Sequence, residues 1–120
     1  MAQKDVVGRA GEDRAAAHLE KRGWRLVERN WRCRQGELDI VALDGDDLVV
    51  VEVKTRRGVG FGHPLEAIDA RKRARLWHLA MAWAVDHPDV ARGREIRLDA
   101  VAVIGADIAT ARIEHVVDLR

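Results

Sequence analysis

Two acidic residues and a lysine lie close together in two short β-rich runs of this 120-residue sequence. Asp39 lies in the run GELDIVAL, and Glu52 and Lys54 lie in the run LVVVEVK. Carboxylate oxygens are the ligands that Mg²⁺ and Mn²⁺ prefer, whereas zinc prefers histidine and cysteine. A nearby ammonium group can orient a water molecule and stabilise charge that develops on a phosphate. The pattern is therefore typical of metal-assisted phosphodiester hydrolysis.

The turn sequence DGDD joins the two runs and predicts a β-hairpin. If residues 44–47 form the turn, Asp39 lies opposite Glu52 and Glu37 lies opposite Lys54. A two-residue turn shifts the pairing but keeps the same faces, because side chains alternate along a strand; a three-residue turn breaks the arrangement. Directly opposed carboxylates weaken a sheet, so the pair indicates a bound cation, with Glu37 as a supporting residue.

A surface hairpin is the alternative explanation of these residues. In that case Glu37 and Lys54 form a cross-strand ion pair and Asp39 points into water. The apolar run VVV before Glu52 favours a central strand instead. A central glutamate and lysine on one face need partners, which favours a functional site over a solvated surface.

The rest of the chain predicts one α/β domain over residues 1–120, in which helices flank a mixed sheet. The order is a helix, three strands, a second helix and one or two further strands. Residues of good helix propensity with a glycine stop, or with apolar residues along one stripe, predict the helices. Alternating and β-branched runs predict the strands. The expected helices span 5–22 and 65–85, and the expected strands span 24–30, 36–43, 48–54, 96–104 and 112–117.

Charge is segregated along the chain, although 21 basic and 20 acidic residues nearly cancel. Residues 1–36 carry 9 basic and 5 acidic side chains, and residues 53–75 carry 7 and 2. Residues 37–52, between them, carry 6 acidic side chains and no basic one. A polyanion is attracted to the flanks and repelled from the middle unless cations bind there. Nucleic acid is the expected partner.

The basic residues nearest the acidic block are candidates for phosphate contacts. Arg56 and Arg57 follow the Lys54 strand and lead into a glycine-rich loop, where the backbone can approach phosphates. Phe61, in the same loop, is the aromatic residue to test as a wedge between bases. A mobile loop with solvated charges is the alternative for each arginine.

Further cations come from the two predicted helices. Lys72 and Arg73 lie in the first half of the second helix, where positive charge opposes the helix dipole. Lys72 shares a helical stripe with Ile68 and Leu76, which predicts that it points towards the site. Arg9 on the first helix is a weaker candidate for the same phosphate path.

Composition excludes several classes of protein. One cysteine, Cys33, excludes an internal disulfide framework and a four-cysteine zinc site. No apolar run approaches the ~20 residues that span a bilayer, and the N-terminus has no apolar stretch of signal-peptide length. We therefore expect a cytoplasmic protein with no membrane partner.

Asp39, followed after the hairpin by Glu52-Val53-Lys54, resembles the PD-(D/E)xK nuclease signature, with Leu38 where the named dipeptide has proline. From about Gly8 onward the chain is similar to the YraN-like family of small bacterial proteins, which is related to archaeal Holliday-junction resolvases. The resemblance rests on the segments GRAGEDRAAAHLEKRGW, ERNWRCRQGELDIVA, VVVEVKTRRGVGFG and RLDAVAV, and on the helix with Lys72.

The resemblance implies a restriction-endonuclease-like fold. It implies that Asp39 and Glu52 are metal ligands, that Lys54 is the catalytic lysine, and that Glu12 on the first helix completes the acidic site. The implied activity is a Mg²⁺- or Mn²⁺-dependent endonuclease acting on DNA, with branched or nicked DNA as the substrate by family analogy. Two alternatives remain: a nucleic-acid-binding module of the same fold without significant catalysis, and a structural domain. A homodimer is left open.

Overall fold

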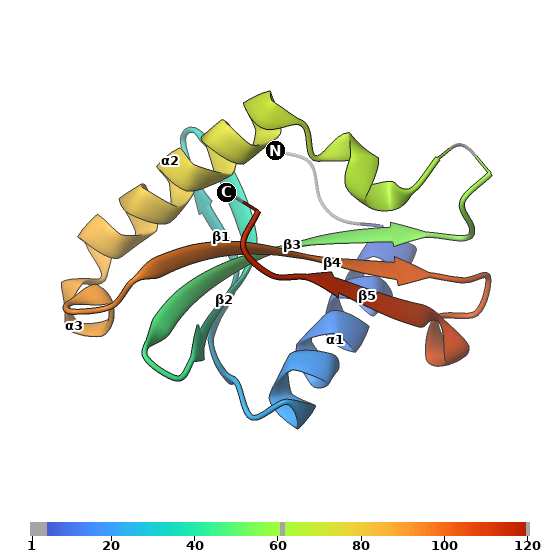
Figure 1. Ribbon diagram of the computed structural model, residues 1–120, viewed down its shortest axis with the longest axis horizontal. Helices are drawn as coiled ribbons and strands as arrows, with labels where there is room; N and C mark the ends of the chain where they lie inside the picture. The colour runs from blue at the N-terminus through green and yellow to red at the C-terminus, as the bar shows by residue number, and fades with distance from the viewer. Residues whose placement is uncertain (1–4, 61, 120) are drawn as a thin grey trace.

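The computed structural model describes residues 5–60 and 62–119, and these form a five-stranded sheet in the order β1-β2-β3-β4-β5 (Figure 1). The strands are β1 (Arg25–Cys33), β2 (Gly36–Asp44), β3 (Asp47–Arg56), β4 (Ile96–Ile104) and β5 (Arg112–Val116). The helices are α1 (Val6–Lys21), α2 (Ala70–Asp86) and the short α3 (Pro88–Ala91), with 3-10 turns η1 (Pro64–Ala67) and η2 (Ile108–Thr110). None of these helices is long and apolar enough to cross a membrane.

The sheet is mixed. β1, β2 and β3 are antiparallel neighbours, β3 and β4 are parallel, and β5 runs antiparallel to β4. Parallel strands need a long crossover connection, and here η1 and α2 form it. The expected class, a mixed α/β sheet flanked by helices, is confirmed, with two strands after the second helix.

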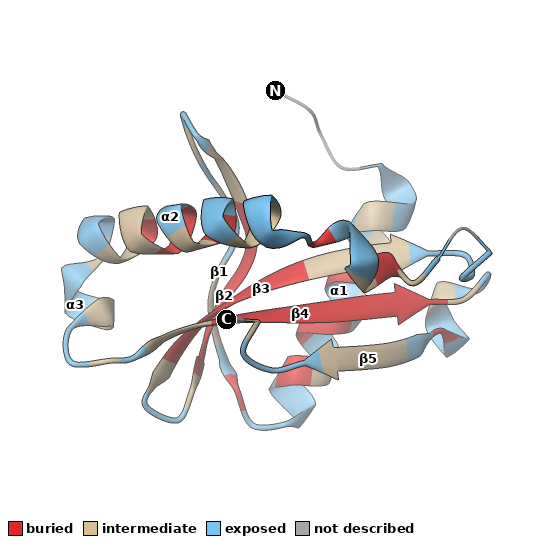
Figure 2. Cartoon of the chain, turned by 45° about the horizontal axis from the view of Figure 1, so that its top comes forward, coloured by how far each residue is buried: buried red, intermediate tan, exposed pale blue. Residues whose placement is uncertain are grey.

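The two long helices cover opposite faces of the sheet (Figure 1). Ala15 and Leu19 of α1 pack with Val49 and Val51 of β3, whereas Trp83 of α2 belongs to the cluster on the other face. Figure 2 shows that burial is concentrated in β2, β3 and β4. Side chains alternate along β3. Because Leu48 and Val50 lie in the cluster under α2, Glu52 and Lys54 are directed to the same face of the sheet.

The predicted second helix is interrupted. Residues 64–67 form η1, and α2 starts only at Ala70. The side chain of Asp69 caps this start, because its Oδ1 accepts a hydrogen bond from the backbone N–H of Lys72 at 2.8 Å. Lys72 and Arg73 therefore lie in the first turn of α2, and the cap offsets part of the dipole cost of their charge.

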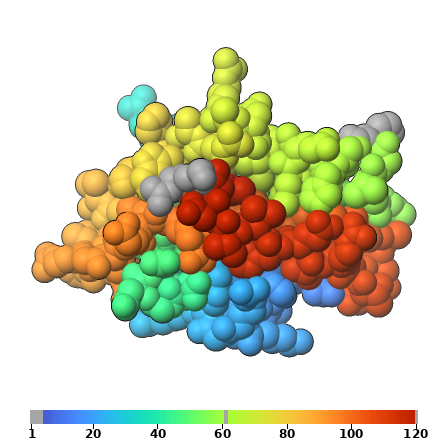
Figure 3. All heavy atoms as spheres, in the orientation of Figure 1, coloured from blue at the N-terminus to red at the C-terminus, as the bar shows by residue number. Residues whose placement is uncertain are grey.

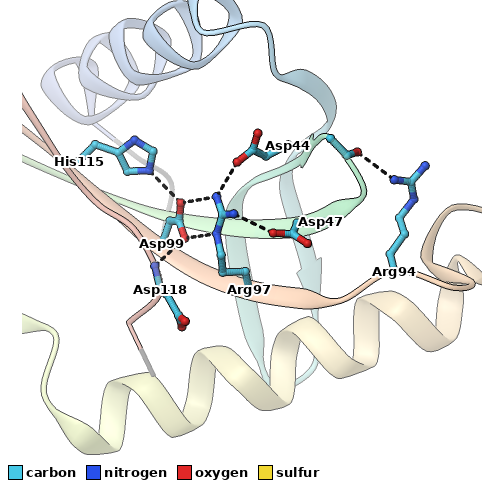
Figure 4. Close-up of polar contacts among 8 residues, drawn as sticks. Asp44, Asp47, Arg94, Arg97, Asp99, His115 and Asp118 are labelled. Atoms are coloured by element: carbon cyan, nitrogen blue, oxygen red, sulfur yellow. Dashed lines mark hydrogen bonds and ion pairs between the residues drawn. The ribbon is translucent and has the colours of Figure 1, made fainter.

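A charge cluster around the buried Asp99 ties the β2–β3 turn to β4 and to the end of the chain (Figure 4). Arg97 donates two hydrogen bonds to fully buried Asp99 and one each to Asp44 and Asp47, at 2.9 to 3.1 Å. Asp99 also contacts His115 Nε2 at 2.8 Å. Because every charge in this cluster meets an opposite or hydrogen-bonding group, we assign it a structural role.

Candidate active site

The carboxylates of Asp39 and Glu52 meet on the α2 side of the sheet. They are only 7% and 6% exposed, and the side chain of Glu52 hydrogen-bonds to Asp39. Burial and the neighbouring Asp39 charge raise the pKa of Glu52 above its ordinary value, while Lys72 and Lys54 oppose the rise. Two acidic groups held together out of water need a proton or a cation between them.

The hairpin register that places this pair agrees with the expected one. Ile40 pairs with Val51 and Asp44 pairs with Asp47, so the strands are aligned as a 44–47 turn requires. The ladder ends at Ile40–Val51, one position before the acidic pair. Beyond that point Asp39 Oδ2 accepts a hydrogen bond from the backbone N–H of Val53 at 2.8 Å, which fixes the carboxylate beside β3.

Two lysines contact the same oxygen of Glu52. Lys54 Nζ lies 3.5 Å from Oε2 and Lys72 Nζ lies 3.3 Å from it. Lys54 comes from β3 and Lys72 from the first turn of α2, so sheet and helix each place one ammonium group at the acidic pair. The predicted inward direction of Lys72 agrees with this contact.

Glu12 on α1 is buried and contacts Arg29 and Asn30 of β1. Its Oε2 accepts hydrogen bonds from Arg29 at 2.8 and 3.1 Å and from Asn30 Nδ2 at 2.9 Å. It lines a hollow of about 230 Å³ together with Lys54 and Thr55. Within residues 5–60 and 62–119, no three histidine, cysteine, aspartate or glutamate residues are grouped closely enough to hold one ion. A shared metal site of Glu12, Asp39 and Glu52 thus stays a prediction.

The packing of α1 on β3 explains how Glu12 reaches the interior. A Cβ atom at Gly11 would overlap the side chain of Thr55, so glycine is required for the close approach of helix and strand. The next residue, Glu12, is thereby pressed against the sheet and is only 1% exposed.

Glu37 lies beyond the end of the β2–β3 ladder, so the expected position opposite Lys54 is not formed although the register is the expected one. The β2–β3 ladder stops at Ile40–Val51, and Glu37 instead pairs with Arg32 of β1, with an ion pair of 3.0 Å. The reason is a break in alternation. Strict alternation would place Leu38 and Val41 on opposite faces of the sheet, but both pack in the same cluster.

Apart from Lys72, which contacts Glu52, the candidate phosphate-binding residues come from the end of β3, the loop after it, α1 and α2. Arg56 and Arg57 are exposed at the end of β3 and just beyond it, and Arg9 is exposed on α1. Arg73 donates to the carbonyl oxygen of Ile68 at 3.2 Å, and side chains at the start of α2 project from the upper edge of the molecule (Figure 3). Phe61 lies outside the described residues.

Sequence reasoning missed the residues that hold Glu12. Arg29 and Asn30 come from one strand, and neighbouring residues of a strand ordinarily point to opposite faces. Asn30 has a positive φ of 56°, which allows both side chains to reach Glu12. Asparagine is tolerant of this conformation, but nothing in the local pattern distinguishes Asn30 from an ordinary strand residue.

The fold and the site define a small mixed α/β domain with buried carboxylates and lysines at the point where two central strands part. The chain belongs to the family described as "Uncharacterised protein family UPF0102", whose model matches residues 11–103. It is 52% identical over 115 residues to a UPF0102 protein of Arthrobacter sp. (strain FB24), a match that covers 96% of each chain.

Two solved structures are similar at low sequence identity. One is a crystal structure of a repair endonuclease from Pyrococcus abyssi, with a TM-score of 0.48 and 17% identity over 90% of this chain. The other is the structure of an EndoMS–dsDNA2 complex, with a TM-score of 0.44 and 13% identity over 91% of this chain. This chain spans 43% of the length of each of those chains.

Proposed function

We propose that this protein is a metal-dependent nuclease that hydrolyses phosphodiester bonds of DNA. The observation that carries the proposal is the buried Asp39–Glu52 pair with Lys54 and Lys72 at 3.5 and 3.3 Å from one Glu52 oxygen. A binding surface has no need for opposed buried carboxylates, whose proximity costs stability. A reaction that develops negative charge on phosphate uses both the acidic pair and the ammonium groups.

The residues at the site fit a hard divalent cation. Asp39 and Glu52 offer carboxylate oxygens, and burial together with the nearby Asp39 charge raises the pKa of Glu52, a cost to its charged form that such a cation would relieve. Mg²⁺ is commonly held by one or two carboxylates together with substrate phosphates, so a protein pair is sufficient. When bound, the cation lowers the pKa of a water molecule and stabilises phosphoryl charge.

Each side chain has a defined task in this proposal. Asp39 and Glu52 hold the cation, and the Val53 N–H keeps the Asp39 carboxylate in position. Lys54 donates to the attacking water or to a phosphate oxygen and neutralises charge in the transition state. Lys72 offsets the charge of Glu52 from the helix side. Glu12, which borders the same hollow as Lys54, is proposed as an accessory acidic group.

The exposed arginines would bind the DNA backbone around this centre. Arg56 is the last residue of β3, the strand that carries Lys54, and Arg57 follows it. A DNA strand whose scissile phosphate lies at Lys54 therefore passes within their reach. Such contacts position the substrate and carry no sequence preference of their own. Branched or nicked DNA is the proposed substrate form.

The test is a cleavage panel over linear, nicked, flapped and four-way DNA with Mg²⁺, Mn²⁺ or EDTA. We expect cleavage of at least one substrate with either metal and none with EDTA. Glu52→Gln should abolish cleavage while the protein stays folded, because the amide cannot serve as a charged metal ligand. Glu20→Gln, which changes an exposed glutamate of α1, is the matched control and should cleave normally. Binding without cleavage across the whole panel would instead support a nucleic-acid-binding module.

A further inference from the structure

A cleft of about 470 Å³ lies between the β1–β2 turn and the first half of α2. Residues 33–37 form one wall, and Lys72, Arg75, Leu76 and Leu79 of α2 form the other. Because Lys72 lines this turn–helix cleft and also contacts Glu52, the cleft opens beside the candidate active site. Its volume falls within the ~300–1,000 Å³ typical of sites for small organic groups.

The walls of the turn–helix cleft combine apolar groups, three cationic residues and one acidic residue, Glu37, whose charge is paired with Arg32. Leu76 and Leu79, almost wholly buried, form its apolar floor. Arg34 and Arg75 bring guanidinium groups to its edge, and Lys72 brings an ammonium group. An apolar floor with cations around it matches the face of a nucleobase and its attached phosphate, because arginine planes stack on bases and pair with phosphate oxygens.

The cleft is held in shape by contacts between its two walls. Arg75 Nη2 donates to the carbonyl oxygen of Gln35 at 3.0 Å, which fixes the turn to α2. Gly36 has a φ of +150°, and a Cβ there would come within 3.4 Å of Arg75 Nη2 and Leu79 Cδ1. A residue with a side chain would therefore be strained at this φ, while its Cβ would be in ordinary contact with both neighbours.

We infer that the turn–helix cleft binds one unpaired nucleotide of the substrate strand next to the phosphodiester that is cleaved. The inference rests on the proposed nuclease function and adds the form of its substrate. A paired base is stacked on both faces and cannot enter a pocket, whereas an unpaired or extruded base can. Preference for flapped DNA over fully paired DNA then follows from the cleft, since a flap supplies an unpaired base beside an intact backbone.

Cys33 makes the inference directly testable, because it lines the cleft and is the one cysteine of the chain. The Lys54→Met protein, which should bind without cutting, is treated with iodoacetamide, and alkylation is followed by mass spectrometry. One sample contains a flapped duplex and the other a fully paired duplex of equal length, both with Mg²⁺. Fluorescence anisotropy of the same samples is used to choose DNA concentrations at which the same fraction of the protein is bound to each duplex.

We expect the flapped duplex to slow alkylation of Cys33 at least fivefold and the paired duplex to slow it less than twofold. Equal protection, or no protection at saturation, would overturn the inference and leave the nuclease proposal standing. Absence of binding to any DNA in the anisotropy measurement would instead remove the proposed function, and the inference with it.

A substitution gives an independent measure. Arg34→Ala changes an exposed residue of the turn and poses little risk to folding. It should weaken binding of the flapped duplex at least fivefold and of the paired duplex less than twofold, whereas Arg92→Ala, at an exposed position that does not line the cleft, should change neither. An equal loss of affinity for both duplexes would assign Arg34 to general backbone binding and would contradict the proposal that the cleft binds an unpaired nucleotide.

Discussion

The Asp39 carboxylate accepts a hydrogen bond from the backbone N–H of Val53 at 2.8 Å, beyond the point where the β2–β3 ladder ends. The backbone carbonyl groups of β2 no longer pair with β3 here, and the Asp39 side chain accepts the hydrogen bond of the Val53 N–H in their place. The same contact holds the carboxylate next to Glu52 on β3. The acidic pair therefore lies where β2 and β3 separate, and the Asp39 side chain connects the two strands there.

Lys54→Met separates an enzyme from a binding protein. The change keeps an apolar stem and removes the ammonium group 3.5 Å from Glu52. We expect the single-turnover cleavage rate to fall by two or more orders of magnitude, since each ~1.4 kcal/mol of lost transition-state stabilisation is tenfold. DNA affinity should change only a few-fold. Arg92→Met is the control for loss of one exposed cation, and equal cleavage by Lys54→Met and wild type would refute the assignment.

Lys72 and Arg73 are neighbours in sequence with different contacts, so they form a matched pair. Lys72→Met removes the ammonium group beside Glu52 and should lower the cleavage rate at least tenfold. Arg73→Met should leave the rate on saturating substrate unchanged and reduce the salt dependence of DNA binding by about one unit of slope, as expected for one phosphate contact. Anisotropy titrations over a range of salt measure the slope, and single-turnover kinetics measure the cleavage rate. A loss of cleavage in Arg73→Met with normal cleavage in Lys72→Met would contradict the structure.

Gly11→Ala tests the close packing of α1 on β3. The new Cβ would overlap Thr55, so we expect the free energy of unfolding to fall by about 2 kcal/mol despite the better helix propensity of alanine. Thr55→Ala in the same chain removes most of the overlapping atoms and should recover part of the loss. Urea denaturation of the single and double variants gives the comparison, and an unchanged midpoint for Gly11→Ala would show that α1 is not so tightly seated.

The Asp99 cluster predicts a pH dependence of stability. Burial acts to raise the pKa of Asp99, but hydrogen bonds from His115, Arg97 and the Asp118 N–H outweigh it and hold the pKa below its ordinary value. A carboxyl group with a lowered folded-state pKa adds stability above its unfolded pKa of ~3.9, and that stability is lost as the pH falls through the folded value.

Asp99→Asn should therefore cost about 3 kcal/mol at pH 7, because it removes one charge of a buried cluster. The difference from wild type should shrink as the pH is lowered below about 4. Urea denaturation between pH 3 and 7 measures it, with the exposed turn variant Asp46→Asn as control. A difference that is constant across this range would show that Asp99 does not titrate with folding as described.

The sequence is sufficient to predict the long helices and the strands, apart from the break before α2, and to place Asp39 beside Glu52. Strand alternation and a short acidic turn fix that pairing locally, and both signals lie within one hairpin. The stripe that contains Lys72 also predicts its direction, because a helix face is determined by the residues that it buries.

The contacts of Glu12 and Glu37 could not be predicted in the same way. They depend on irregular backbone at Asn30 and between Leu38 and Val41, where alternation fails. Neither glycine nor proline marks these positions, and a single asparagine within an alternating run does not distinguish an irregular strand from a regular one. The turn–helix cleft was also beyond prediction, because it arises from the seating of α2 against a turn about forty residues earlier in the chain.

The parallel pairing of β3 with β4 has a consequence for the order of folding. The β2–β3 hairpin closes through the contact of Asp44 with Asp47, whereas Val50 and Leu98, partners in the parallel ladder, lie 48 positions apart. Local contacts form faster than distant ones, since closing a long loop costs more entropy. The nascent hairpin thus brings two negative charges together before the helix delivers Lys72, so divalent cations should accelerate the first step of assembly.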